Sequence, residues 1–397
     1  MTINNENKKL NVPNLRFPEF QGEWEKCKLS EICTFFSGGT PSSSNKDFYG
    51  GNIAFIRSGE LHANSTELFI TKAGFNSSSA KMVEVGDLLL AMYGATSGEI
   101  AISKIEGAIN QAILCVRTKQ NKKFIESVWN KHVSKILRKY LQGGQGNLSA
   151  DIVKGISFYF PTIAEQGRIA NLVSLLDERI ATQNKVIDKL QSLIRGIMVE
   201  LQKEGEDRGT WKKVFLSDVL TERNERNTNL YQVFSVSVSQ GIVNQVDYLG
   251  RSFAAKDTSK YNVVHYGDLV YTKSPTGAFP YGIVKQSPNH ENVAVSPLYG
   301  VYKPCNLAVG AYLHEYFMSE INTHNYLHSL IQKGAKNTIN ITNQRFLENS
   351  VLLPINDDEL LLISKLLRSL NDKVKNHQNI LKKHQKQKQY LLRQMFI

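Results

Sequence analysis

One phrase occurs twice in this chain, and the duplication limits the folds that the chain can adopt. The segment "GEWEKCKLSEI" at residues 22–32 returns as "GTWKKVFLSDV" at residues 209–219, with Gly-x-Trp, then Leu-Ser and an acidic residue in both copies. Tryptophan occurs only three times in 397 residues, so two tryptophans at matching places indicate an internal repeat. We therefore expect two copies of one domain.

The repeat extends beyond the tryptophans. "VEVGDLLLAMYG" at residues 83–94 matches "VHYGDLVYTKSP" at residues 264–275, and "NLS" at 147–149 matches "NIT" at 340–342. The separation between matching residues changes along the chain, which indicates one scaffold with loops of different length. We expect Asp87 and Asp268 to be turn residues that enter a strand, and Asn147 and Asn340 to cap a short helix.

Each copy ends in a helix-start pattern. Thr162 and Glu165, and in the second copy Asn356 and Glu359, have the spacing of a capping box. The first pattern predicts a helix that stops at Gly205 and the second a helix that runs to the chain end, each about 60 Å long. The seam positions repeat at heptad spacing and are Ile169, Val173, Leu176, Ile180, Gln183, Ile187, Leu190 and Ile194 in the first helix, with Ile363, Leu367, Leu370, Val374, His377 and Leu381 in the second.

A long helix with one apolar stripe is stable in water only when it buries that stripe against a partner. The duplicate helix is the nearest partner, so we expect an antiparallel two-helix coiled coil with approximate internal twofold symmetry. Gln183 and His377 interrupt the two seams at matching positions. They either set the register of the pair or are tolerated polar positions.

The segments between the helices are rich in strand patterns. Short runs of β-branched and aromatic residues such as "NIAFI", "DLLLAMY", "AILCV", "YQVFSVSVS" and "DLVYT" are bounded by Gly, Ser, Asn and Pro. Helical patches are expected at 122–140 and 310–331. The predicted class is α+β, with domains at 1–160 (including a polar tail at 1–13) and 206–353, and helices at 161–205 and 354–397.

Composition indicates a cytoplasmic protein with a polyanionic partner. The net charge is +12, and phosphate neutralisation by such a chain supplies sequence-independent affinity for nucleic acid. The four cysteines lack metal-site spacing and are expected to be reduced thiols. The start of the chain is polar and no apolar run has the length of a membrane span.

The sequence offers no convincing catalytic or metal motif. It contains no Gly-Lys dipeptide, hence no P-loop, and no methyltransferase tetrapeptide of Asn or Asp, two prolines and an aromatic residue. His324 and His328 have a zinc-ligand spacing, but a general-base Glu and a third ligand are missing, so a surface pair is expected. We therefore predict a non-catalytic chain without a metal.

After Asp372 the chain has no acidic residue, while six lysines and Arg393 follow. This basic half of the second helix has two readings. It contacts DNA phosphate or an acidic partner surface, or it serves only to place cations near a helix C-terminus.

The order of these motifs resembles the specificity subunits of type I restriction–modification systems. The segments that carry the resemblance are "VPNLRFPEFQGEWEKCKLSEI", "VGDLLLAMYGATSGEIAI", "GGQGNLSADIVKGISFYFPTIAEQGRIANLVSLLDERI" and their matches in the second copy. The resemblance implies that each domain is a target-recognition domain that reads half of a split DNA site. It also implies that the helices set the gap and dock two methyltransferase subunits, which bind S-adenosylmethionine, while motor subunits use ATP and magnesium.

Two other classes stay open at this point: a single-chain methyltransferase or nuclease with two recognition domains, and a coiled-coil scaffold without a DNA role. On the main reading, exposed basic and amide side chains in loops are the candidates for DNA contact. They are Arg57, Ser58, Tyr93, Thr96 and Gln145 in the first copy, and Arg251, Lys256, Lys273, Lys333, Lys336 and Asn337 in the second.

Overall fold

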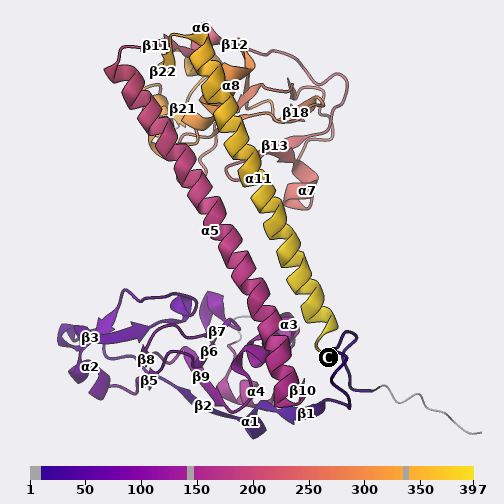
Figure 1. Cartoon of the computed structure of the whole chain (residues 1–397). Coiled ribbons are helices and arrows are strands. Elements are labelled where there is room, and N and C mark those ends of the chain that lie inside the picture. The colour runs from indigo at the N-terminus through magenta and orange to yellow at the C-terminus, as the bar shows by residue number, and fades with distance from the viewer. Residues whose placement is uncertain (1–9, 141–146, 334–338) are drawn as a thin grey trace, which may run out of the picture. The chain divides into compact units, whose positions relative to one another are not determined.

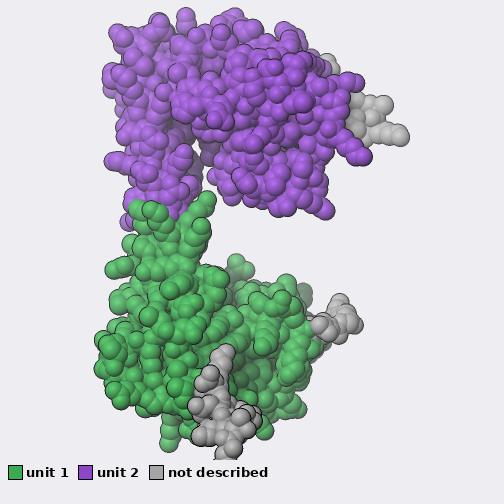
Figure 2. Space-filling model, turned by 90° about the vertical axis from the view of Figure 1, so that its right-hand side faces the viewer, with its two compact units in different colours: residues 1–183, 380–397 green, residues 184–379 purple. Residues whose placement is uncertain are grey.

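The computed structural model describes residues 10–140, 147–333 and 339–397, without the side chains of 332–340. The chain divides into two compact units (Figure 2), unit 1 being Met1–Gln183 with Ile380–Ile397 and unit 2 being Asn184–Asn379. Each unit holds one globular domain and part of two long helices, α5 (Ile163–Asp207) and α11 (Asp357–Gln394), which are seen in Figure 1. The observed class is α+β, as predicted.

The globular part of unit 1 contains ten strands and four short or medium helices among its described residues. The strands are β1 Glu25–Lys28, β2 Cys33–Ser37, β3 Tyr49–Ile56, β4 Phe69–Ile70, β5 Lys81–Val83, β6 Leu88–Ala91, β7 Ile100–Ile102, β8 Gly107–Ile109, β9 Ile113–Thr118 and β10 Ser157–Phe160. The helices are α1 Leu29–Ile32, α2 Lys72–Asn76, α3 Lys122–Tyr140 and α4 Ala150–Gly155.

Unit 2 repeats much of this order. Its strands are β11 Trp211–Phe215, β12 Leu220–Glu222, β13 Phe234–Ser237, β14 Gly241–Asn244, β15 Asn262–Val264, β16 Leu269–Tyr271, β17 Val284–Gln286, β18 Val293–Val295, β19 Gly300–Pro304, β20 Gln332–Lys333, β21 Ile339–Asn340 and β22 Ser350–Pro354. Its short helices are α6 Leu216–Val219, α7 Gln245–Leu249, α8 Leu307–Tyr316, α9 Glu320–His328 and α10 Asn343–Phe346.

The two domains share the topology of one four-stranded sheet and of one two-stranded ribbon. One four-stranded sheet of unit 1 has the order β2-β9-β6-β7, and the four-stranded sheet of unit 2 has the matching order β12-β19-β16-β17. Unit 1 has a second four-stranded sheet, β4-β3-β8-β5, where the described part of unit 2 has the two-stranded sheets β13-β14 and β15-β18. The repeated Gly-x-Trp phrase forms the same antiparallel ribbon twice, β1 with β10 and β11 with β22, each followed by a four-residue helix. The strands predicted from "NIAFI", "DLLLAMY", "AILCV", "YQVFSVSVS" and "DLVYT" correspond to β3, β6, β9, β13 and β16.

Within unit 1 the long helices pair in antiparallel fashion. Ile169 near the start of α5 belongs to the same buried apolar core as Met395 and Phe396 at the end of the chain. Farther along, Asp177 of α5 lies 2.5 Å from the amine of Lys388 of α11. Because rising numbers on α5 meet falling numbers on α11, the two helices run in opposite directions.

Unit 2 shows the same arrangement at the other ends of the helices. Gly205 near the end of α5 and Glu359 near the start of α11 both contact Trp211. Across the two units, the predicted seam residues are all buried or half-buried: Ile169, Val173, Leu176, Ile180, Gln183, Ile187, Leu190, Ile194, Ile363, Leu367, Leu370, Val374, His377 and Leu381. A role of Gln183 and His377 in setting the register stays a prediction.

Three local expectations are corrected by the structure. Helix α5 passes through Gly205 and ends at Asp207, because position 205 serves close packing: a Cβ there would lie 2.2 Å from the Trp211 ring. The helical patch at 310–331 is two helices, separated where Ser319 caps α9. Ser149 and Thr342, each two residues beyond the predicted Asn, cap the short helices α4 and α10.

The cores are apolar, and the cysteines belong to the scaffold. All four cysteines are free thiols, and Cys33 and Cys115 are buried. Burial is the main cause that raises the pKa of the Cys115 thiol to about 12, which keeps it protonated and unreactive. No helix in the described part of the chain is both long and apolar enough to cross a lipid bilayer.

Candidate nucleic-acid interface

The β6–β7 hairpin of unit 1 carries two of the predicted DNA-contacting residues, Tyr93 and Thr96. Its loop at 92–99 contains a 3-10 turn, Gly94–Thr96, and both side chains are half-buried. Trp129 of α3 donates a hydrogen bond of 2.8 Å from Nε1 to the carbonyl of Gly98. The loop is thus fixed against α3, and it presents a defined surface rather than a free end.

The last turns of α3, which contact this loop, also carry basic residues. A Cβ at position 98 would contact Val133 and Leu137 of α3, so the loop base lies against these turns. Lys135, Arg138 and Lys139 are exposed on the same turns. Sequence reasoning missed them, because the contact between these turns and the hairpin depends on how the helix packs and not on any local motif.

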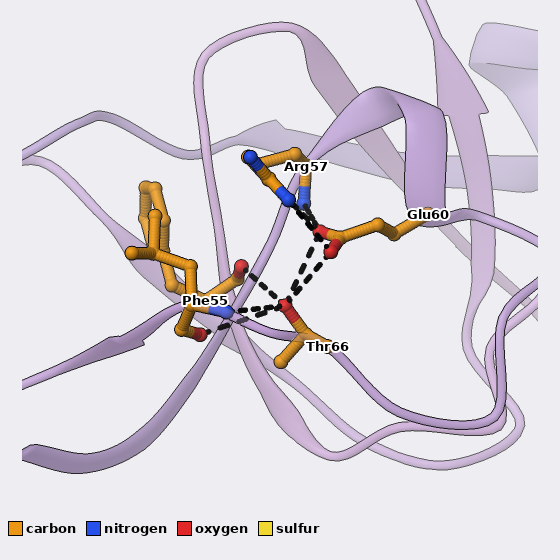
Figure 3. A network of polar contacts seen from close by, with 5 residues as sticks. Phe55, Arg57, Glu60 and Thr66 are labelled. Carbon is orange, nitrogen blue, oxygen red and sulfur yellow. Dashed lines mark hydrogen bonds and ion pairs between the residues drawn. The ribbon is translucent and has the colours of Figure 1, made fainter. Parts of the chain in front are cut away.

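Arg57, a third candidate, is already occupied by an intramolecular partner (Figure 3). Its guanidinium donates from Nη2 to Glu60 Oε1 at 3.0 Å and from Nε to Oε2 at 3.2 Å, and Thr66 donates to the same carboxylate. Burial raises the pKa of Glu60, but the hydrogen bonds and charge of Arg57 outweigh it and hold that pKa below its ordinary value. Arg57 therefore keeps only part of its donor set for DNA, and its neighbour Ser58 is half-buried.

Unit 2 places its described candidates on separate loops. Arg251 and Lys256 are exposed in the segment after α7, where the Arg251 guanidinium stacks 4.5 Å from the Phe253 ring centre. Lys273 is half-buried in the β16–β17 loop at 272–283, and burial lowers its pKa while Glu222 opposes this change. The side chains of Gln145, Lys333, Lys336 and Asn337 lie outside the described residues.

The β16–β17 loop rests on a group of rings. The ring centres of Tyr281 and His324 are 5.1 Å apart, and His324 stacks on His328 of the same helix at 5.3 Å. In the first copy, Trp129, Val133 and Leu137 of α3 contact the matching loop instead. The described residues include no cluster of three or more His, Cys, Asp or Glu side chains suited to a metal ion. The histidine pair is exposed, and its structural contact is with Tyr281.

The repeated Gly-Asp-Leu motif supports both hairpins. Asp87 accepts hydrogen bonds from Arg117 and from the backbone of Glu84, and Asp268 accepts them from Arg223 and the backbone of His265. Gly86 and Gly267 before them have φ of 91° and 84°, which glycine adopts without strain. Both aspartates are therefore turn residues that enter a strand, as the sequence indicated.

The sequence predicted only part of the contacts that join each domain to its long helix. Thr162 caps α5 as predicted, but Glu165 does not complete a capping box. Its carboxylate instead accepts from Trp24 Nε1 at 3.3 Å and from Arg16, and Glu359 likewise accepts from Trp211 Nε1 at 2.9 Å. The repeated Trp and the repeated Glu, 141 residues apart in the first copy and 148 in the second, thus form the same hydrogen bond in both copies.

The fold and its surfaces define a class of protein: two domains of one topology, each attached to a pair of antiparallel helices, with basic residues on loops. Residues 21–192 match the family model described as "Type I restriction modification DNA specificity domain". The structure is similar over 97% of this chain, with a TM-score of 0.63 at 12% identity, to the S subunit of a type I restriction-modification system from M. genitalium.

Two curated relatives agree with this. The chain is 29% identical over 174 residues to the EcoR124I/EcoR124II specificity subunit of Escherichia coli, covering 41% of this chain and 43% of the relative. It is 24% identical over 196 residues to the MjaVIII specificity subunit of Methanocaldococcus jannaschii, covering 48% and 44%. The alignments thus span less than half of each relative. Over these stretches the chain is similar to type I restriction–modification specificity subunits, and residues 21–192 match the DNA specificity domain of that family.

Proposed function

We propose that this chain supplies DNA sequence recognition to a type I restriction–modification complex and performs no catalysis itself. Each globular domain reads one half of a bipartite site in double-stranded DNA. The long helices set the gap between the halves and dock two methyltransferase subunits. S-adenosylmethionine binds to those subunits, and ATP and magnesium bind to the motor subunits that restrict DNA.

The observation that carries this proposal is the pattern of sameness and difference between the copies. The sheet order and the tryptophan–glutamate joint are the same in both domains. The hairpin loops differ in length and in the residues beneath them, 92–99 over Trp129 in one copy and 272–283 over a histidine pair in the other. A shared scaffold with different loops is what reading two different half-sites requires.

Helix length supports the spacing role. Helix α5 has 45 residues and α11 has 38, so at about 1.5 Å per residue they reach roughly 55–70 Å. Successive major grooves on one DNA face recur about every 34–36 Å, within the reach of such helices. Adding one heptad to each helix is expected to lengthen the gap and leave both half-sites unchanged.

Methylation mapping of a host genome with and without this gene tests the proposal. We expect a bipartite adenine motif that disappears on deletion. Replacement of residues 14–160 by the matching domain of another specificity subunit is expected to change one half of the motif only. If both halves change, the assignment of one domain to one half-site is wrong, and if no motif depends on the gene, the chain has another function.

A further inference from the structure

The last three turns of α11 carry a basic face that has no acidic partner among the described residues. Five side chains line a shallow groove along it: Lys382, Gln385, Lys386, Gln389 and Arg393. The spacing of three and four residues places them on one side of the helix. Lys382, Lys386 and Arg393 are exposed.

These cations differ from the lysine that belongs to the helix pair. Lys388, on the seam side, lies 2.5 Å from the carboxylate of Asp177. Within the part of the chain that the structure describes, no carboxylate lies within ion-pair distance of Lys382, Lys386 or Arg393. The face therefore presents three positive charges that no carboxylate of the described residues neutralises.

The helix dipole does not account for this charge. Its effect is confined to the last turn of a helix, which here includes Arg393 but not Lys382, twelve residues before the end of α11 at Gln394. The side-chain amides of Gln385 and Gln389 lie between the cations, and amides as well as cations bind phosphate oxygens. The face is thus a strip of hydrogen-bond donors about 16 Å long.

The other copy of the helix shows that the fold does not need these charges. The matching positions on α5, each 194 residues earlier, are Asp188, Gln191, Ser192, Arg195 and Val199. That face has no net charge, and Arg195 donates to Ser192 within it at 2.9 Å. A surface that both copies used for the same kind of partner subunit is expected to have similar charge in both, so the asymmetry disfavours a shared protein-docking role.

We propose that the basic face of α11 (Lys382, Gln385, Lys386, Gln389, Arg393) binds the phosphate backbone of double-stranded DNA and adds sequence-independent affinity. This inference rests on the proposed function but names a contact outside the recognition domains. Three neutralised phosphates release counterions, so they contribute about 2.7 to the slope of log affinity against log salt.

The test uses the full-length chain and a random-sequence DNA duplex, with affinity measured by fluorescence anisotropy from about 50 to 200 mM salt. The variant K382Q/K386Q/R393Q is expected to lower the salt slope by about 2–3 and to weaken binding roughly 10-fold or more at the lower salt. The matched control K365Q/K373Q/K375Q removes the same charge from exposed lysines of α11 in unit 2. Far-ultraviolet circular dichroism verifies that both variants keep the helix.

An equal loss in both variants overturns the proposal, because net charge alone then explains it. An unchanged slope with weaker recovery of methyltransferase subunits in co-purification also overturns it, because the face then binds protein. Methylation mapping distinguishes failure of the basic-face proposal from failure of the proposed function. If the triple variant gives a normal bipartite motif and an unchanged salt slope, only the basic-face contact is refuted. If the wild-type gene itself gives no methylation motif, the specificity function is refuted.

Discussion

The two joints between domain and helix show what the duplicated scaffold keeps and what it changes. In unit 1, Trp24 donates to Glu165, and in unit 2, Trp211 donates to Glu359. In both units the tryptophan is buried where one long helix begins and the other ends. The geometry of the joint is the same because the ribbon that carries the tryptophan is the same.

The charges around the joints are unlike. Asp177 of α5 lies between Lys123 of α3 and Lys388 of α11, which makes an ionic tie in unit 1. The residue 194 positions later is Asn371, whose amide donates to Glu315 of α8 at 2.6 Å in unit 2. The same helix position therefore attaches its domain through a carboxylate in one copy and through an amide in the other.

The electrostatic consequences run in opposite directions. Burial opposes ionisation at Asp177, but Lys123 and Lys388 outweigh it and lower its pKa, so this tie is ionic at neutral pH. Burial instead raises the pKa of Glu315, lowers that of Lys285 to about 8 and lowers that of His314 to about 3. At this helix position, unit 2 thus surrounds the amide with ionisable groups whose charged forms are disfavoured, whereas unit 1 pairs its carboxylate with two lysines. A shared backbone tolerates either solution.

The largest expected effect comes from removing the joint glutamates. Glu165 is 1% exposed and also holds Arg16 through two hydrogen bonds of 2.8 Å. Glu165→Ala therefore leaves an indole N–H unpaired and removes the only carboxylate that is paired with the Arg16 guanidinium among the described residues. Of its hydrogen bonds within the described residues, the guanidinium keeps only those to the carbonyls of Gln21 and Gly22. We expect a loss of about 3–5 kcal/mol in the free energy of unfolding. Glu359→Ala leaves only the Trp211 N–H unpaired and is expected to cost about 1–3 kcal/mol.

Hydrogen exchange resolved by peptide measures both losses, at the β1–β10 ribbon in unit 1 and the β11–β22 ribbon in unit 2. Glu165→Gln serves as the control, because it keeps an acceptor for the indole and removes only the charge opposite Arg16. Equal losses from the two alanine variants would show that Arg16 contributes nothing to the joint.

A smaller difference is expected on acidification, and it belongs to unit 2. His314 Nδ1 accepts a hydrogen bond from the backbone of Gln286, and the folded pKa of about 3 lies below the ordinary value of 6.5. The unfolded chain therefore binds the proton first, so stability is full above about pH 6.5 and falls as the pH drops toward 3. At pH 5 the expected loss is about 2 kcal/mol relative to pH 7.

Exchange of β17 and α8 at pH 7 and pH 5, corrected for intrinsic rates, measures this loss. The variant His314→Gln is expected to remove most of it. Burial also lowers the pKa of His132 in unit 1, so His132→Gln is the matched control and is expected to leave β17 unaffected. A wild-type loss that persists in His314→Gln would assign the acid response to another group.

The sequence predicted the features that repeat and missed those that depend on packing. Heptad spacing and the tryptophan phrases predict the helices, the duplication and the strands, because these patterns are local or recur. The partner of Glu165 was predicted wrongly as its own helix end, since nothing local indicates that Trp24 and Arg16 fold back onto it. Sequence analysis missed two further features for the same reason. The contact of the last turns of α3 with the β6–β7 loop and the contact of Tyr281 with His324 each join distant segments.

The smallest expected effect tests whether the two ties are interchangeable. Asp177→Asn gives unit 1 the residue type that unit 2 has at this position, and it leaves Lys123 and Lys388 without their shared carboxylate. The side chain of Asp177 is 30% exposed, so solvent screens part of the interaction and we expect a loss of about 1 kcal/mol. Lys123 keeps an ion pair with Glu126, which limits the loss further.

Because the tie is ionic, the difference between wild type and Asp177→Asn is expected to shrink at about 1 M salt. Asn371→Ala in unit 2, which removes an amide rather than a charge, is the control whose cost is expected to be independent of salt. Denaturant unfolding at low and high salt measures the stability loss of both variants. A salt-independent loss for Asp177→Asn would mean that hydrogen-bond geometry, and not charge, stabilises this contact in both copies.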